Sequence, residues 1–282
     1  MLKSFFTLFC LLAGIVATAQ ERIYEKVDST FITQVIEGHT NASRKEAGNQ
    51  LLSIAAEFLN REYVAGTLDA HNGEPLVISA TELDCTTFVE TVLAIYITAK
   101  ESDGTFEAFS KNLEKIRYRN GKREGYASRL HYISQWIDDS AKQGIITEVT
   151  EELPHSSSIL NLNYMSTHPT SYRILKENPQ LVKDIAIWEK PYRGCKMLYI
   201  PKETLYKSNK ELHIKDGDIL ALTTNIEGLD VVHTGFAFWE NGQLHLLHAS
   251  SAAGKVVKEE RSLYLYQKNK KSHTGARVFR VK

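Results

Sequence analysis

The spacing of apolar residues changes from helical to alternating about two-thirds of the way along the chain. In the first part, apolar residues recur at the spacing of one buried face of an amphipathic helix. The clearest case begins at about Cys85, where Phe88, Val92 and Ile95 form one stripe. The same pattern predicts helices over residues 24–40 with a turn at Gly38, 43–59 with Ser43 as N-cap, 106–116 and 126–141. Residues 145–190 are irregular and contain several prolines, so we expect loops and short helices there.

The last third of the chain alternates apolar and polar residues, which is typical of strands. Strands are predicted over residues 219–223, 231–239, 244–249, 256–257, 263–266 and 278–281. Asn241-Gly242, between the second and third of these, is a strong hairpin signal. Helices followed by an antiparallel meander predict an α+β fold, with the helices packed on one face of the sheet.

This hairpin places two histidines side by side. With a two-residue turn at Asn241-Gly242, Gly235 faces His248. His233 and His248 then share a face of the sheet as diagonal neighbours, about 7–8 Å apart at the backbone. His245 points to the opposite face, where we expect an ordinary strand position. A one-residue slip in register would exchange these faces.

Cys85 is predicted to lie in the first turn of its helix, with Asp84 as the N-cap. The unpaired backbone N–H groups and the helix dipole there favour an anion, so we expect a lowered thiol pKa and a nucleophilic thiolate. A small buried hydrophobe is the commoner fate of a lone cysteine, but the polar run Asp-Cys-Thr-Thr argues against simple core filling. His233 can act as a general base toward Cys85, and His248 can orient His233.

A metal site is the competing use of the histidines. His245 and His248 are three residues apart on a strand and therefore face opposite sides. The sequence contains no His-Glu-x-x-His motif, no Cys-x-x-Cys pair, no serine nucleophile elbow and no phosphate-binding glycine loop. We therefore expect neither a metal nor another cofactor.

The N-terminus predicts export. Residues 1–19 combine Lys3, an apolar run and Ala17-Thr18-Ala19, which is typical of a secretory signal peptide cleaved between Ala19 and Gln20. We therefore expect a periplasmic protein. Residues 20–282 are expected to form a single domain, with a helical and loop insertion at about residues 100–190 that forms a lobe beside the core.

The composition of the chain limits the classes of partner that it is expected to bind. The chain has 34 basic and 34 acidic residues, and this formal net charge of zero gives no electrostatic footprint for nucleic acid. No stretch of the mature chain predicts stable insertion into a membrane, and we expect a monomer. After removal of the predicted signal peptide, the chain keeps two cysteines, Cys85 and Cys195. They allow at most one disulfide, so a disulfide-stapled scaffold is excluded.

Three motifs together resemble those of a known superfamily, the NlpC-type, papain-like cell-wall cysteine peptidases and amidases. They are Leu83-Asp84-Cys85-Thr86-Thr87-Phe88-Val89, His233-Thr234-Gly235-Phe236-Ala237 and Leu246-Leu247-His248-Ala249-Ser250-Ser251. The resemblance implies a papain-like core, in which the nucleophile helix packs on an antiparallel sheet. It also implies that Tyr63, in a Tyr-x-x-Gly segment, helps to stabilise the oxyanion.

The inserted segment is similar to that of the N-acetylmuramoyl-L-alanine amidase-like branch of this superfamily, through residues 127–132 and 162–166. The resemblance implies a cysteine-dependent amidase that cuts the amide between N-acetylmuramic acid and L-alanine in peptidoglycan fragments, including anhydro-muropeptides of wall turnover. An endopeptidase that cuts between D-glutamyl and a diamino acid uses the same catalytic groups. A non-catalytic wall-binding module is an alternative of another class.

A sugar-bearing substrate requires a wide cleft with aromatic walls and hydrogen-bond donors. Candidates for binding it are Asp84, Arg129, Tyr132, Trp136, Tyr164 and Met165. Each of these side chains could instead be core or surface. Trp136 falls among the apolar positions of its predicted helix, where a core role is favoured.

Overall fold

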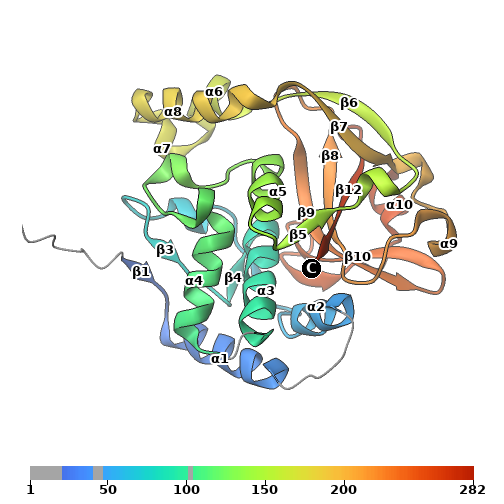
Figure 1. Ribbon diagram of the computed structural model, residues 1–282, viewed down its shortest axis with the longest axis horizontal. Coiled ribbons are helices and arrows are strands. Elements are labelled where there is room, and N and C mark those ends of the chain that lie inside the picture. The colour runs from blue at the N-terminus through green and yellow to red at the C-terminus, as the bar shows by residue number, and fades with distance from the viewer. Residues whose placement is uncertain (1–20, 41–46, 101–103) are drawn as a thin grey trace, which may run out of the picture.

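The computed structural model describes residues 21–40, 47–100 and 104–282, so the predicted signal peptide and Ser43 lie outside it. The fold is a mixed α+β arrangement in which a large sheet has helices on both of its faces (Figure 1). Within the described ranges, no helix is both long enough and apolar enough to span a lipid bilayer.

The large sheet has the strand order β4-β2-β11-β10-β9-β8-β12-β7-β6, and β5 pairs with β12 beside this path. Strands β1 and β3 form a separate parallel pair. The strand bounds are β1 (Arg22–Ile23), β2 (Glu62–Tyr63), β3 (Leu76–Val77), β4 (Glu82–Leu83), β5 (Ile146–Glu148), β6 (Ser156–Asn161), β7 (Arg193–Pro201), β8 (Ile219–Thr224), β9 (Val231–Glu240), β10 (Gln243–Ser250), β11 (Lys255–Lys258) and β12 (His273–Val281).

Two helices begin at the predicted residues, whereas the helix predicted over residues 126–141 begins only at Ile133. Those predicted to start at Cys85 and Phe106 do so, and the turn expected at Gly38 is instead part of a continuous helix. The helix bounds are α1 (Lys26–Thr40), α2 (Ala47–Ala56), α3 (Cys85–Lys100), α4 (Phe106–Arg117), α5 (Ile133–Lys142), α6 (Tyr164–Thr167), α7 (Arg173–Lys176), α8 (Pro179–Glu189), α9 (Asn209–Leu212) and α10 (Leu263–Lys268).

The central strands supply two cores, one on each face of the sheet. Phe236 of β9 faces α3, where it meets Phe88 edge-on with ring centroids 5.7 Å apart. Ala237, the next residue, belongs instead to the core on the other face, which includes Tyr266 of α10. The expectation of helices on one face only is therefore wrong. Every residue of β8 is buried, so both faces of the sheet must be covered.

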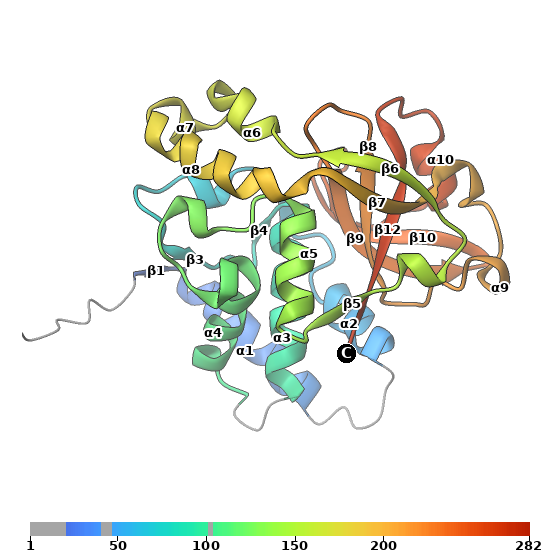
Figure 2. The same ribbon diagram turned by 45° about the horizontal axis from the view of Figure 1, so that its top comes forward.

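The segment 145–190 is more regular than its composition predicts. Strand β5 extends the sheet beside β12, and β6 pairs along β7 as an arm that carries α6, α7 and α8 away from the sheet (Figure 2). The side chains of β6 are mostly exposed, so the segment lacked an apolar strand signal. The inserted lobe therefore contains strands of the large sheet as well as helices and loops.

The strand predicted at residues 263–266 is wrong, because these residues open helix α10. Ser262 caps the helix, and its hydroxyl accepts a hydrogen bond from the Leu265 N–H. Leu263 and Tyr266 then lie one turn apart on the face that packs against the sheet. A run of four apolar residues does not by itself distinguish a strand from a helix.

Candidate active site

Cys85 occupies the first position of α3, and the turn that holds it is fixed by Asp84. The Asp84 carboxylate accepts hydrogen bonds from the backbone N–H groups of Thr86 at 3.1 Å and Thr87 at 2.8 Å. The Thr87 hydroxyl in turn accepts from the Asp84 N–H at 2.9 Å. These reciprocal bonds satisfy donors at the helix start, and they confirm Asp84 as the N-cap.

The thiol of Cys85 is neutral at rest. Desolvation by the surrounding protein is the main cause that raises its pKa to about 11, and the Asp84 carboxylate contributes to this rise. Hydrogen bonds from Thr234 and Thr86 favour the thiolate, but they are outweighed. The predicted resting thiolate is therefore wrong, because burial and a neighbouring negative charge overcome the helix dipole.

The histidine pair, His233 and His248, lies as the hairpin geometry predicts. Strands β9 and β10 pair Trp239 with Leu244, which is the register of a two-residue turn at Asn241-Gly242. The Nε2 atom of His233 lies 2.5 Å from Nδ1 of His248. His245 points to the other face, where its Nδ1 contacts the Glu259 carbonyl oxygen at 3.0 Å.

Gly235 allows the close approach of the two strands beside the histidine pair. A Cβ atom at this position would lie 2.8 Å from the Leu247 carbonyl oxygen and 2.9 Å from Cβ of His248. Only a glycine leaves this space free without moving β10. The Gly in the His-Thr-Gly motif therefore has a steric role in seating His248 against His233.

Thr234 joins the helix start to the sheet. Its hydroxyl donates a hydrogen bond to the Cys85 carbonyl oxygen at 2.9 Å, so the residue beside His233 directly contacts the nucleophile's backbone. Among the described residues, the hydrogen-bond partners of the Cys85 sulfur are Thr86 and Thr234, and His233 is not one of them. Catalytic hydrogen bonds commonly tighten only when substrate is bound.

Both histidines are neutral in this environment. Burial lowers the pKa of His233 well below its usual value, and the cationic surroundings, including Lys270, lower it further. Burial also lowers the pKa of His248 to about 4, although Glu259 opposes this. A neutral imidazole has a free nitrogen lone pair, so His233 is chemically able to accept a proton.

Tyr63 of β2 lies near the nucleophile. Strand β2 pairs in parallel with β4, and Tyr63 is directly opposite Leu83, two residues before Cys85. Burial is the main cause that raises the pKa of the Tyr63 phenol to about 12, and the negative forms of Cys85 and Asp84 contribute to this rise. The phenol therefore keeps its proton and is available as a hydrogen-bond donor.

Tyr266 of α10 is part of this cluster, and sequence reasoning missed it. Its ring centroid lies 5.5 Å from that of His248 and 6.2 Å from that of His233. The Lys270 ammonium lies over the same ring, 3.6 Å from its centroid. The apolar run at residues 263–266 predicts a strand, and the helix-capping Ser262 is the sequence signal that favours a helix instead.

Most of the predicted substrate-binding residues are buried in the lobe and do not line an open cleft. Arg129 is ion-paired with Asp69 at 2.6 Å and Glu74 at 3.1 Å. The Tyr132 hydroxyl donates to Glu189 at 2.7 Å and accepts from the Met165 N–H at 2.8 Å. Buried residues of this set are Arg129, Tyr132, Trp136 and Met165. The contacts of Arg129, Tyr132 and Met165 assemble the lobe, so the prediction that these three side chains form cleft walls is wrong. Trp136 lies in the main core, which is the role favoured for it.

Tyr164 differs from the other lobe candidates, because its side chain is only half-buried and stacks on His168 with ring centroids 4.3 Å apart. Asp84 lies beside the nucleophile but uses its carboxylate as the helix cap. As for metals, the described part of the chain has no group of three or more His, Cys, Asp or Glu side chains arranged to hold an ion.

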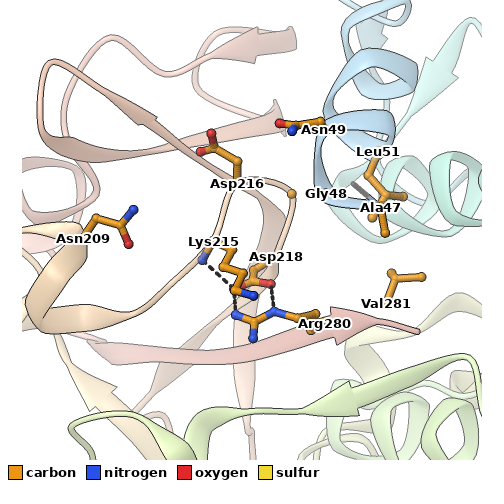
Figure 3. A pocket seen from close by; sticks show the side chains of 11 residues that line it. Ala47, Gly48, Asn49, Leu51, Asn209, Lys215, Asp216, Asp218, Arg280 and Val281 are labelled. Carbon is orange, nitrogen blue, oxygen red and sulfur yellow. Dashed lines mark hydrogen bonds and ion pairs between the residues drawn. The ribbon is translucent and has the colours of Figure 1, made fainter. Parts of the chain in front are cut away.

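A cavity of about 460 Å³ lies elsewhere, between the first turns of α2, the turn before β8 and the end of β12 (Figure 3). Arg280 in its wall donates to the Asp218 carboxylate at 2.8 and 2.7 Å, so this pair of charges is neutralised within the protein. None of its lining residues belongs to the cluster around Cys85. The cluster, and not this cavity, has the chemistry of a candidate active site.

Comparison with known proteins supports one family. A family model described as AmiA-like, N-acetylmuramoyl-L-alanine amidase-like, matches residues 53–275. A crystal structure of an N-acetylmuramoyl-L-alanine amidase from Bacteroides uniformis is 42% identical and covers 84% of this chain and 100% of its own, with a TM-score of 0.79. A search among curated proteins gives no match.

Two further solved structures are similar. A protein from Bacteroides fragilis, provisionally named a xylanase, is 46% identical over 81% of this chain and 99% of its own, with a TM-score of 0.76. A Legionella pneumophila protein is 23% identical over 90% of this chain and 94% of its own, with a TM-score of 0.66, and shares the fold.

Proposed function

The chain belongs to the AmiA-like, N-acetylmuramoyl-L-alanine amidase-like family, and on that premise we propose that it is a cysteine-dependent amidase. Its substrate is the amide between N-acetylmuramic acid and L-alanine in muropeptides, including the anhydro-muropeptides of wall turnover. The observation that carries the proposal is the capped Cys85 at the start of α3, whose carbonyl oxygen accepts a hydrogen bond from Thr234 on β9, the strand that carries His233. His233 in turn contacts His248 on β10.

The neutral resting state sets the order of proton transfers. The thiol proton of Cys85 moves to Nδ1 of His233 as sulfur attacks the substrate carbonyl, because a thiol with a pKa of about 11 is not ionised beforehand. The resulting imidazolium donates through Nε2 to His248 and returns the Nδ1 proton to the leaving amine. Water then hydrolyses the thioester, again with His233 as the base.

The negative charge that develops on the carbonyl oxygen needs donors. The backbone N–H of Cys85, at the positive end of α3, and the protonated Tyr63 phenol are the groups that we propose for this role. Removing one such donor in an acyl-transfer enzyme costs about 2.7–4 kcal/mol of barrier. Tyr63→Phe is therefore the natural variant for separating this role from substrate binding.

Digestion of purified muropeptides, followed by mass spectrometry, tests the proposal. The wild-type protein is expected to release L-Ala-headed peptide and intact disaccharide, and Cys85→Ala is expected to abolish release while a chelator leaves the wild type active. Cys195→Ala is the matched control, because Cys195 is exposed and its thiol donates to the Pro191 carbonyl oxygen, away from the cluster around Cys85. Full turnover by Cys85→Ala would end the cysteine mechanism.

The same digest separates the alternatives. Cleavage between D-glutamyl and the diamino acid would identify an endopeptidase instead, since that reaction uses the same three groups. Binding of muropeptide without any product would identify a wall-binding module. The family match and the amidase named among the similar structures favour the amidase.

The placement in the papain-like, NlpC-type superfamily and the export to the periplasm belong to the same proposal. The order of cysteine before histidine along the chain and the motifs around Cys85, His233 and His248 support the placement. The signal-like residues 1–19 support export. N-terminal sequencing of the protein recovered from the periplasm should begin at Gln20.

A further inference from the structure

A carboxylate that the proposed mechanism does not use lies beside His248, on the side of the ring away from His233. Glu259 follows β11, and its Oε2 atom lies 3.8 Å from Nε2 of His248. This distance is too long for a hydrogen bond, but it is short enough for the carboxylate charge to act on the buried imidazole nitrogen. His248 is fully buried, and within the described chain its Nε2 has no hydrogen-bond partner.

Backbone contacts hold Glu259 at this position. Its N–H donates to the Leu246 carbonyl oxygen at 2.9 Å, and its carbonyl oxygen contacts Nδ1 of His245 at 3.0 Å. Both partners lie on β10, the strand that carries His248. The carboxylate is therefore anchored to the same strand as the imidazole that it faces.

Arg261 fixes the orientation of the carboxylate. Its Nε donates to Oε1 of Glu259 at 2.8 Å and its Nη2 donates to Oε2 at 3.1 Å, while its backbone N–H donates to Oε1 at 3.3 Å. Burial raises the pKa of Glu259, but the hydrogen bonds and the charge of Arg261, together with His248, lower it overall. Glu259 is accordingly ionised at neutral pH and can only accept hydrogen bonds.

This arrangement determines where the protons lie in the neutral histidines. A carboxylate facing Nε2 of His248 favours the tautomer with the proton on that nitrogen, because a lone pair there would face a negative charge. Nδ1 of His248 is then an acceptor, so Nε2 of His233, 2.5 Å away, must donate. The remaining nitrogen of His233, Nδ1, therefore carries a lone pair.

We propose that Glu259 is a positioning residue that sets the tautomers of both histidines, so that Nδ1 of His233 is free to take the Cys85 proton. The carboxylate does not touch the reacting atoms and acts only through His248. This inference rests on the proposed cysteine mechanism for its effect on turnover. The assignment of the two tautomers can be tested without any substrate.

Other ionisable groups surround the pair and are unchanged in the experiment below. They are Cys85 on α3, Tyr63 on β2, Tyr266 and Lys270 on and after α10, Arg261 before α10 and His273 on β12. Tyr266 keeps its proton, because burial raises its pKa to about 12. The carboxylate that faces Nε2 of His248 is that of Glu259, which is the group changed in the experiment.

Glu259→Gln is the decisive variant. Arg261 donates to the Oε1 position through both Nε and its backbone N–H, but to the Oε2 position through Nη2 alone. The amide oxygen therefore satisfies more donors at the Oε1 position, which leaves the amide NH₂ nearest His248. An N–H donor at that position favours a lone pair on Nε2 of His248, so the proton of His248 moves to Nδ1. Nε2 of His233 must then accept the hydrogen bond between the two rings, and Nδ1 of His233 carries the proton. His233 can then no longer accept the thiol proton.

The expected loss is at least about 100-fold in kcat, with KM unchanged, because general-base assistance is removed and substrate contacts are not. Glu260→Gln is the matched control, since Glu260 is the exposed neighbour and undergoes the same chemical change. Glu259→Asp keeps a carboxylate and should retain most of the activity. A purely structural role of Glu259 would instead lower the melting temperature in step with activity.

Tautomers are measured directly by ¹⁵N NMR of histidine-labelled full-length protein at neutral pH. The wild type should show the Nε2–H form at both His233 and His248, and Glu259→Gln should show the Nδ1–H form at both. A wild-type His248 protonated on Nδ1 would overturn the inference, as would a Glu259→Gln variant with wild-type kcat. If no muropeptide is cleaved, the proposed function fails, but the NMR result still decides the tautomers.

Discussion

At the scale of single residues, the chemistry of Cys85 depends on its immediate neighbours more than on its helix. The thiol has the favourable position at the start of α3, yet burial and Asp84 raise its pKa to about 11. The same Asp84 stabilises the helix start, because its carboxylate caps the helix that holds the sulfur. One side chain therefore stabilises the turn and suppresses the thiolate.

Replacing Asp84 by Asn separates these two effects. The amide oxygen still accepts from the Thr86 and Thr87 N–H groups, so the cap remains, whereas the negative charge that raises the thiol pKa is removed. The Cys85 pKa is expected to fall, and alkylation by iodoacetamide at pH 8 should become several-fold faster. A Cys195→Ser background removes the exposed second thiol. An unchanged alkylation rate would show that burial alone controls the thiol.

At the scale of elements, the site consists of the β9–β10 hairpin and the first turn of α3. Strands β9 and β10 bring His233 and His248 together because their register is fixed by the two-residue turn. Gly235 lets the two strands approach at the histidine pair. Helix α10 then covers the pair with Tyr266 on the face opposite α3.

Gly235→Ala tests the strand contact. The added methyl group would lie under 3.0 Å from the Leu247 carbonyl oxygen and Cβ of His248, so β10 must move. Overpacking of this kind costs about 1–3 kcal/mol, and displacing His248 should also lower kcat on muropeptides by at least about tenfold. Urea unfolding and turnover measure the two effects.

Gly38→Ala is the matched control for that substitution. Gly38 lies within α1, where an added Cβ meets nothing within 4 Å. The change is expected to raise the free energy of unfolding by about 0.5–1 kcal/mol and to leave turnover as it is. A Gly235→Ala protein that behaved like Gly38→Ala would remove the steric role assigned to Gly235.

At the scale of the whole molecule, a two-faced sheet leaves several histidines buried and neutral. Burial lowers the pKa of both His248 and His273 to about 4, from an ordinary 6.5. The folded state therefore binds fewer protons than the unfolded state between these pH values. This contribution to stability is complete above pH 6.5 and is lost as the pH falls toward 4.

Acidification from pH 7.5 to 5 is accordingly expected to lower the free energy of unfolding through these groups, by up to about 1.4 kcal/mol per pH unit for each histidine. Urea titrations at several pH values measure it. His273→Leu should show a smaller loss on acidification. Buried Glu74 and Glu90, whose pKa values are raised, act in the opposite direction, so this comparison isolates the histidine. Equal slopes for the two proteins would contradict the assignment.

The sequence by itself determined the local geometry of the site. Helix α3 begins at Cys85 because Asp84 is a good cap, and the register of β9 and β10 follows from Asn241-Gly242. Both features depend on residues close together in the chain, so spacing and turn chemistry suffice to predict them.

Only the tertiary structure decided the properties that depend on distant segments. The pKa of Cys85, the burial of Arg129 and Tyr132 in the lobe, the cover provided by Tyr266 and the carboxylate of Glu259 behind His248 all arise from packing. Desolvation and charge at a site are sums over everything that surrounds it, and no local pattern contains that sum.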